Sequence, residues 1–130
     1  MDYTKEPLSF RLKKVIRYVF MYGIERTLKK VRSQYHMKSV ETFPEDFWVN
    51  NSAADTGDVA IVGCGNFAFS TIAHYVSKNT SGKTKYALDI DKSKALSLAK
   101  FYNVHMATTS FDLIISDPEI KIIYISSNHA

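Results

Sequence analysis

From residue 58 onward, apolar residues follow two alternating patterns. Short runs of β-branched and small residues, such as Val59 to Val62, have the composition of strands buried on both faces. Between these runs, apolar positions recur at helical spacing. The pattern predicts four strands, at 59–62, 84–90, 104–107 and 120–125, separated by helices at about 67–76, 92–102 and 111–116. We therefore expect an α/β fold with a parallel sheet in the order 3-2-1-4, with the strands numbered along the chain.

The first of these strands runs directly into a glycine-rich turn, Gly63-Cys64-Gly65-Asn66-Phe67-Ala68. A Gly-x-Gly-x-x-Ala sequence between a strand and a helix is typical of dinucleotide-binding sites. Gly63 allows the tight turn, Gly65 lets backbone N–H groups approach a pyrophosphate, and Ala68 lets the helix pack closely on the sheet. The partial positive charge of the helix N-terminus favours the same anion. The predicted cofactor-binding residues here are Gly63, Gly65, Asn66, Phe67 and Ala68.

An acidic residue lies where the second predicted strand ends. Asp89 comes 26 positions after Gly63, near the interval of about 20 at which an acidic residue contacts the adenosine ribose in such folds. An aspartate there accepts hydrogen bonds from the ribose hydroxyls and repels a 2′-phosphate. We therefore expect NAD as the cofactor in preference to NADP, although the sequence leaves NADP open. Asp91, two residues further on, either takes this role or caps the following helix.

The first 41 residues have the pattern of a basic helical extension. Apolar positions recur at helical spacing on both sides of Gly23, which predicts two amphipathic helices with a hinge at Tyr22-Gly23. Residues 42–57 are predicted to be a linker, in which Phe43-Pro44 and Phe47-Trp48-Val49 form a short apolar clip. The expected organisation is thus an extension (1–41), a linker (42–57) and a partial nucleotide-binding domain (58–130).

The net charge of +4 resides at the N-terminal end of the chain. The first 50 residues hold ten basic and six acidic side chains, whereas the remaining 80 hold seven of each. One interpretation is an arm that packs on its own protein or on a sister subunit, with Lys and Arg on the solvated face. A second is peripheral contact with an anionic membrane surface. Nucleic acid is disfavoured because no recognition motif is present, and charges recur too often for a membrane span or signal peptide.

Other reactive groups are sparse in this sequence. The single cysteine, Cys64, excludes an internal disulfide and suits a reducing, cytoplasmic location. We expect it to be a packed thiol rather than a nucleophile, since no neighbouring base is evident. No metal site is predicted, because the four histidines are scattered and lack partners at ligand spacing: His36, His74, His105 and His129.

Residues 58–130 resemble the glucose-fructose oxidoreductase, inositol dehydrogenase and MocA-like (Gfo/Idh/MocA) oxidoreductases. The resemblance rests on three segments: the strand and glycine turn at 59–68, the Asp89-Ile90-Asp91 step into an alanine-rich helix, and the turn at 116–120 before Ile123-Tyr124-Ile125-Ser126-Ser127. It implies a Rossmann-type fold and an NAD(P)-dependent oxidoreductase. The implied reaction is hydride transfer between nicotinamide and a hydroxyl carbon of a sugar, sugar nucleotide or cyclitol.

The resemblance also implies further cofactor contacts after the fourth strand. In this family a Thr-Pro-Asn loop at that place lies near the cofactor, and here Ser127, Asn128 and His129 match it without the proline. Ser126, Ser127 and Asn128 are therefore expected at the site.

The family's Glu-Lys-Pro segment and its substrate domain do not occur in these 130 residues. We therefore expect a fragment with a partial Rossmann sheet and no catalytic residue of its own, whose partner is a substrate domain or a sister subunit. The alternative is a non-catalytic nucleotide-sensing or scaffold module, with a membrane- or partner-binding basic helix.

Overall fold

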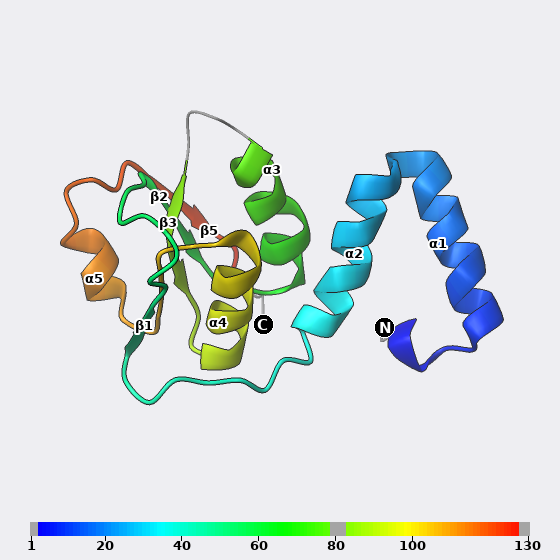
Figure 1. Ribbon diagram of the computed structural model, residues 1–130, viewed down its shortest axis with the longest axis horizontal. Helices are drawn as coiled ribbons and strands as arrows, with labels where there is room; N and C mark the ends of the chain where they lie inside the picture. Colours follow the sequence, from blue (N-terminus) through cyan, green and yellow to red (C-terminus); the bar gives the residue numbers. More distant parts are fainter. Residues whose placement is uncertain (1–2, 79–82, 128–130) are drawn as a thin grey trace.

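The computed structural model describes residues 3–78 and 83–127 (Figure 1). A short 3-10 turn (Tyr3–Lys5) precedes two helices, α1 (Leu8–Tyr22) and α2 (Ile24–His36). Gly23 separates them with a φ of +87°, a left-handed conformation that favours glycine. The helices and their hinge thus lie where the hydrophobic spacing predicts them.

Five strands form one sheet in the order β1-β4-β3-β2-β5. They are β1 (Phe47–Val49), β2 (Val59–Val62), β3 (Thr84–Leu88), β4 (Met106–Thr108) and β5 (Ile122–Ile125). The last four pair in parallel, and their order is the predicted 3-2-1-4. β1 pairs antiparallel with β4, with Trp48 opposite Ala107. Of the apolar clip expected in the linker, residues 47–49 therefore form an edge strand of the sheet, and Phe43 is buried in the core.

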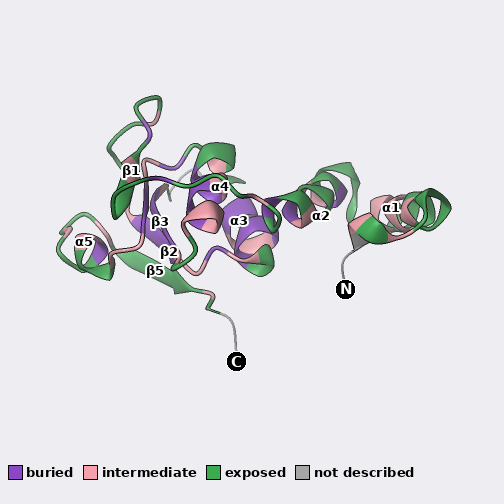
Figure 2. Ribbon diagram, turned by 90° about the horizontal axis from the view of Figure 1, so that it is seen from below, coloured by how far each residue is buried: buried purple, intermediate pink, exposed green. Residues whose placement is uncertain are grey.

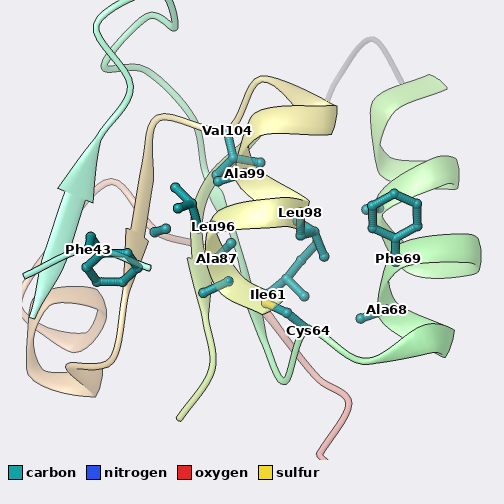
Figure 3. Close-up of a cluster of buried hydrophobic side chains, with 13 residues drawn as sticks. Phe43, Ile61, Cys64, Ala68, Phe69, Ala87, Leu96, Leu98, Ala99 and Val104 are labelled. Atoms are coloured by element: carbon teal, nitrogen blue, oxygen red, sulfur yellow. The ribbon is translucent and has the colours of Figure 1, made fainter. Parts of the chain in front are cut away.

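Helices cover both faces of this sheet. One face carries a continuous helix, whose first part is the π-helical segment η2 (Ala68–Ile72) and whose second part is α3 (Ala73–Lys78), together with α4 (Lys92–Tyr102). The other face carries α5 (Phe111–Ile115). Because neighbouring residues of a strand point to opposite faces, β2 contributes Ile61 to one core and Ala60 to the other. Figure 3 shows the larger core, between the sheet and α3 and α4.

Two strands begin later than the apolar runs predict. Asn103 ends α4 in the left-handed region, and the Val104 N–H donates back to the Ala99 carbonyl at 2.8 Å. Val104 is therefore buried but belongs to the turn, and β4 begins at Met106. Ile120 similarly belongs to a turn, since its N–H donates to the Asp117 carbonyl at 3.3 Å, and β5 begins at Ile122.

The helical extension packs on the nucleotide-binding part through a polar side of α2. The Arg26 guanidinium donates to the Ser70 carbonyl, and Lys29 Nζ lies 4.6 Å from the ring centroid of Phe101. α1 lies on the far side of α2 from the sheet (Figure 1). Figure 2 shows that buried residues concentrate in the sheet, α3 and α4, whereas α1 is largely exposed. The expectation that the apolar side packs on the protein is therefore wrong for α2, where carbonyl and ring contacts hold Arg26 and Lys29. Lys13 and Arg17 of α1 are exposed, as expected.

Candidate dinucleotide-binding site

The glycine turn follows β2 at the carboxyl end of the parallel strands. Gly63 has a φ of +88°, and its N–H donates to the Leu88 carbonyl at 2.8 Å. A Cβ atom at this position would collide with the Ser126 carbonyl and lie 2.9 Å from the Ser127 nitrogen. Only glycine therefore lets the turn approach the chain that leaves β5. The turn lies at the end of β2 beside β5, where the order of the strands reverses. Open α/β sheets bind ligands at such a place.

Gly65 borders open space. A Cβ atom at this position would meet no other atom within 4 Å. The Phe69 N–H donates to the Gly65 carbonyl at 3.0 Å, so the N–H groups of Asn66, Phe67 and Ala68 belong to the first turn, where a helix offers no carbonyl to accept them. Asn66 and Phe67 are exposed, whereas Ala68 is fully buried. Amides at a helix N-terminus beside an open glycine provide the donors that a pyrophosphate requires.

The Asp89 carboxylate lies against this turn. Its Oδ2 accepts a hydrogen bond from the Cys64 N–H at 2.7 Å, and its Oδ1 accepts one from the Asp91 N–H at 2.8 Å. A carboxylate has about four lone-pair positions, so Asp89 retains acceptor capacity after these two bonds. Asp91 instead caps α4, since its Oδ1 accepts from the Ser93 N–H at 3.0 Å. The two acids, interchangeable on the sequence alone, therefore have different surroundings.

The residues after β5 border the same turn. The Ser126 N–H donates to the Val62 carbonyl at 2.7 Å, which extends the pairing of β2 and β5 by one step. Ser127 follows it and is exposed. Both serines thus lie beside Gly63. Asn128, the third residue predicted here, lies outside the described residues, as does His129.

Cys64 is a buried part of the turn. Its thiol donates to the Leu88 carbonyl at 3.3 Å, and the side chain is fully buried. Burial, reinforced by the negative charge of Asp89, raises the pKa of this thiol well above its ordinary value. A thiol that stays protonated is a poor nucleophile, which agrees with the expected packed role.

His36 is a site neighbour that the sequence does not reveal. Its Nε2–H donates to the Cys64 carbonyl at 2.6 Å, because a carbonyl can only accept. Nδ1 therefore accepts from the Ser97 hydroxyl at 2.9 Å, which fixes the tautomer of the neutral ring. The ring also stacks on Phe69 with centroids 4.2 Å apart, and burial lowers its pKa. The end of α2 thus holds the backbone of the glycine turn.

The π-helical segment explains a second contact of the extension. Two carbonyls of this segment accept hydrogen bonds from side chains of neighbouring helices. The Phe69 carbonyl accepts from the Tyr102 hydroxyl, and the Ser70 carbonyl from the Arg26 guanidinium. The helix that begins at the glycine turn is therefore clamped by α4 on one side and by α2 on the other.

Two kinds of feature are absent from residues 3–78 and 83–127. No group of three or more His, Cys, Asp and Glu side chains in these ranges could hold a metal ion. No helix within them is both long enough and apolar enough to cross a bilayer.

Comparison with protein families identifies this architecture. Residues 58–130 match the oxidoreductase family with an NAD-binding Rossmann fold, Gfo/Idh/MocA. No curated protein and no solved structure matches the chain. The family match includes the glycine turn, Asp89 and the four parallel strands, and it spans more than half of the 130 residues. The chain therefore belongs to the Gfo/Idh/MocA oxidoreductases, and residues 58–130 are part of the NAD-binding Rossmann domain of that family.

Proposed function

We propose that this chain binds NAD, with the pyrophosphate at the glycine turn and the adenosine ribose at Asp89. The observation that carries the proposal is the combination of open space at Gly65 with a carboxylate that is hydrogen-bonded to the neighbouring Cys64 N–H. This bond links the two recognition elements before a ligand arrives. Such preorganisation reduces the conformational entropy that the protein loses when the ligand binds.

The charge of Asp89 supports NAD over NADP. Hydrogen bonds from the ribose hydroxyls to a carboxylate are charge-assisted and therefore strong. A 2′-phosphate would place a second negative charge against the same carboxylate, which is unfavourable. Asp91 is already used as the cap of α4, which favours Asp89 as the ribose ligand.

In the whole enzyme, the proposed reaction is hydride transfer between the nicotinamide and a hydroxyl carbon of a sugar, sugar nucleotide or cyclitol. The cofactor supplies the hydride chemistry. The role proposed for this chain is to bind and orient it. In this proposal the amides of Asn66 and Phe67 donate to the pyrophosphate, and Ser126 and Ser127 contact the cofactor after β5. Family membership supports the class of reaction, and the substrate class rests on the resemblance of the segments at 59–68 and 116–127.

Replacing Asp89 tests both the cofactor and the ribose assignment. Asp89→Asn keeps an oxygen that can accept from the Cys64 N–H but removes the charge. We expect NAD affinity to fall by about 1 to 3 kcal/mol, as for the loss of hydrogen bonds to a charged group. NADP affinity should fall less, so the preference for NAD narrows. Calorimetric titration of both nucleotides into the full chain measures this change.

Asp91→Asn is the matched control, because asparagine is as good a helix cap as aspartate. It should leave NAD affinity unchanged. If the loss appeared in Asp91→Asn and not in Asp89→Asn, the ribose assignment would be wrong. Tighter binding of NADP than of NAD to the original chain would contradict the charge argument.

A further inference from the structure

The α1–α2 hairpin presents an apolar face that no described part of the chain covers. Along one side of each helix, large apolar side chains recur every three or four residues. Their exposed fractions range from 38% for Val31 to 87% for Phe20. These residues are Leu8, Leu12, Ile16 and Phe20 on α1, and Ile24, Leu28, Val31 and Tyr35 on α2. A contiguous apolar surface of this kind marks an interaction site on a folded protein.

The two stripes lie on the same side of the hairpin. Gly23 turns the chain so that α2 runs back along α1 (Figure 1). The groove between the helices is lined from both stripes, by Leu8 and Leu12 of α1 and by Val31 and Tyr35 of α2. The hairpin therefore offers one broad face instead of two separate ridges.

The NAD-binding domain occupies a different side of α2. Arg26 and His36 bond to backbone carbonyls of that domain, and Lys29 lies over the ring of Phe101. These contacts orient the hairpin with its apolar face away from the domain. The face is therefore available for a partner that the domain itself does not provide.

The charge of the hairpin distinguishes two candidate partners for this face, a second copy of the chain and an anionic lipid surface. Residues 8–36 contain eight Lys and Arg side chains and one acidic residue, Glu25. Glu25 pairs with Lys78 at 2.7 Å, whereas Lys13, Arg17 and Arg32 are exposed. A second copy docked face to face would bring two such basic clusters together, which like-charge repulsion disfavours. An anionic lipid surface attracts the charges and accepts the apolar face at the same time.

The aromatic content of the hairpin agrees with a lipid surface. Phe20 and Tyr35 lie on the apolar face, and Tyr22 at the hinge is more than half exposed. The tyrosines, whose rings carry a polar hydroxyl, are favoured between lipid headgroups and acyl chains. The wholly apolar Phe20 ring is suited to the acyl-chain side of that boundary. Exposed Lys13 and Arg17 can extend from the same helix to the lipid phosphates.

We propose that the α1–α2 hairpin binds an anionic bilayer through this apolar face and holds the NAD-binding domain at the membrane surface. The helices lie in the plane of the interface. Their apolar side chains enter the boundary between headgroups and acyl chains, and their basic side chains contact the phosphates. Neither helix crosses the bilayer in this arrangement, which accords with their lack of membrane-spanning character.

Co-sedimentation of the full 130-residue chain with vesicles tests the proposal. The chain should pellet with vesicles of phosphatidylcholine and phosphatidylserine, and less with phosphatidylcholine alone. Raising the salt from about 0.1 M to about 1 M should reduce pelleting, because the Debye length falls from about 10 Å to about 3 Å. A sample without vesicles corrects for self-association.

Variants on the exposed face distinguish this binding from nonspecific adsorption to vesicles. Phe20→Glu should weaken binding to anionic vesicles by about tenfold or more. The substitution removes an aromatic side chain that the proposal places in the bilayer, and it adds a charge of the same sign as the lipid headgroups. The double variant Lys13→Glu, Arg17→Glu should reduce both the pelleting with anionic vesicles and its dependence on salt, because two exposed basic side chains become acidic. Ile115→Glu on α5, where Ile115 is 60% exposed, is the matched control and should pellet as the original chain does. All variants should keep their helical circular dichroism, since the changed side chains are exposed.

Several results would overturn the proposal. One is that the original chain stays in the supernatant with anionic vesicles at low salt. Another is that Phe20→Glu pellets as well as Ile115→Glu does. A dimer without lipid that Phe20→Glu converts to a monomer in analytical ultracentrifugation would assign the face to a second copy.

Discussion

At the scale of single residues, the two glycines of the turn have separate tasks. Gly63 serves the fold, because its positive φ and the nearby Ser126 carbonyl exclude any side chain. Gly65 has neither constraint, since a Cβ atom there would meet nothing within 4 Å. Its lack of a side chain therefore matters for a ligand and not for packing.

This difference predicts that the same substitution is strongly destabilising at Gly63 and nearly neutral at Gly65. Gly63→Ala should lower the free energy of unfolding by about 3 kcal/mol, because it combines an unfavourable backbone conformation with a collision at β5. Gly65→Ala should change it by no more than about 0.5 kcal/mol, as for a surface substitution. Urea unfolding of both variants measures the difference. Equal stability of the two variants would contradict the geometry of the turn.

Local sequence patterns predict part of the site and miss the rest. The turn at Gly63 and the acid at Asp89 follow from residue type and spacing within one strand-turn-helix unit. The separate role of Asp91 does not, because a capping bond depends on where the helix starts. His36 could not be predicted at all. It reaches the Cys64 carbonyl from 28 positions away in the chain, and no periodicity encodes that contact.

At the scale of secondary-structure elements, α2 shows how amphipathicity can predict a helix without its orientation. The stripe of Ile24, Leu28 and Val31 correctly indicates a helix, and such a stripe usually faces the core. Here the opposite side packs inward, because Arg26 donates to the Ser70 carbonyl and Lys29 lies over the rings of Phe101 and Tyr102. These partners exist only after η2 and α4 are assembled, so the sequence of α2 alone does not reveal them.

The helix beneath α2 contains a buried histidine that should make stability depend on pH. His74 in α3 is 1% exposed, and neither ring nitrogen has a hydrogen-bond partner among the described residues. Burial, with the positive charges of Arg26 and Lys78, lowers its pKa below the ordinary value of 6.5. The unfolded chain therefore takes up a proton before the folded chain does. This stabilising contribution is complete above about pH 6.5 and is lost as the pH falls from there towards the lower folded pKa.

His74→Leu should remove this dependence. At neutral pH it should raise the free energy of unfolding by about 1 kcal/mol, because two unsatisfied buried nitrogens disappear. The difference in free energy of unfolding between His74→Leu and the original chain should be larger at about pH 5, where His74 of the original chain binds a proton on unfolding. Urea midpoints of both proteins at about pH 7.5 and about pH 5 test this. A constant difference between the two proteins at both pH values would contradict it.

At the scale of the whole molecule, the order of the parallel strands follows from the alternation of strand and helix, since right-handed crossovers leave few other arrangements. The edge strand β1 was harder to predict, because Phe47 to Val49 is short and pairs with a strand nearly 60 positions away. At the opposite edge, all four side chains of β5 are exposed. The chain thus combines a family-typical nucleotide-binding sheet with a basic hairpin whose apolar face is open.

The central claim is that the glycine turn receives the pyrophosphate of NAD, and Gly65→Val tests it most directly. A valine there meets open space in the folded protein but occupies the path of the pyrophosphate. The measurement is calorimetric titration of NAD into the full chain and into the variant, with circular dichroism to verify that both are folded. We predict that the original chain binds NAD and that the folded variant does not. Equal affinity of the two proteins for NAD, or no binding by the original chain, would contradict the account.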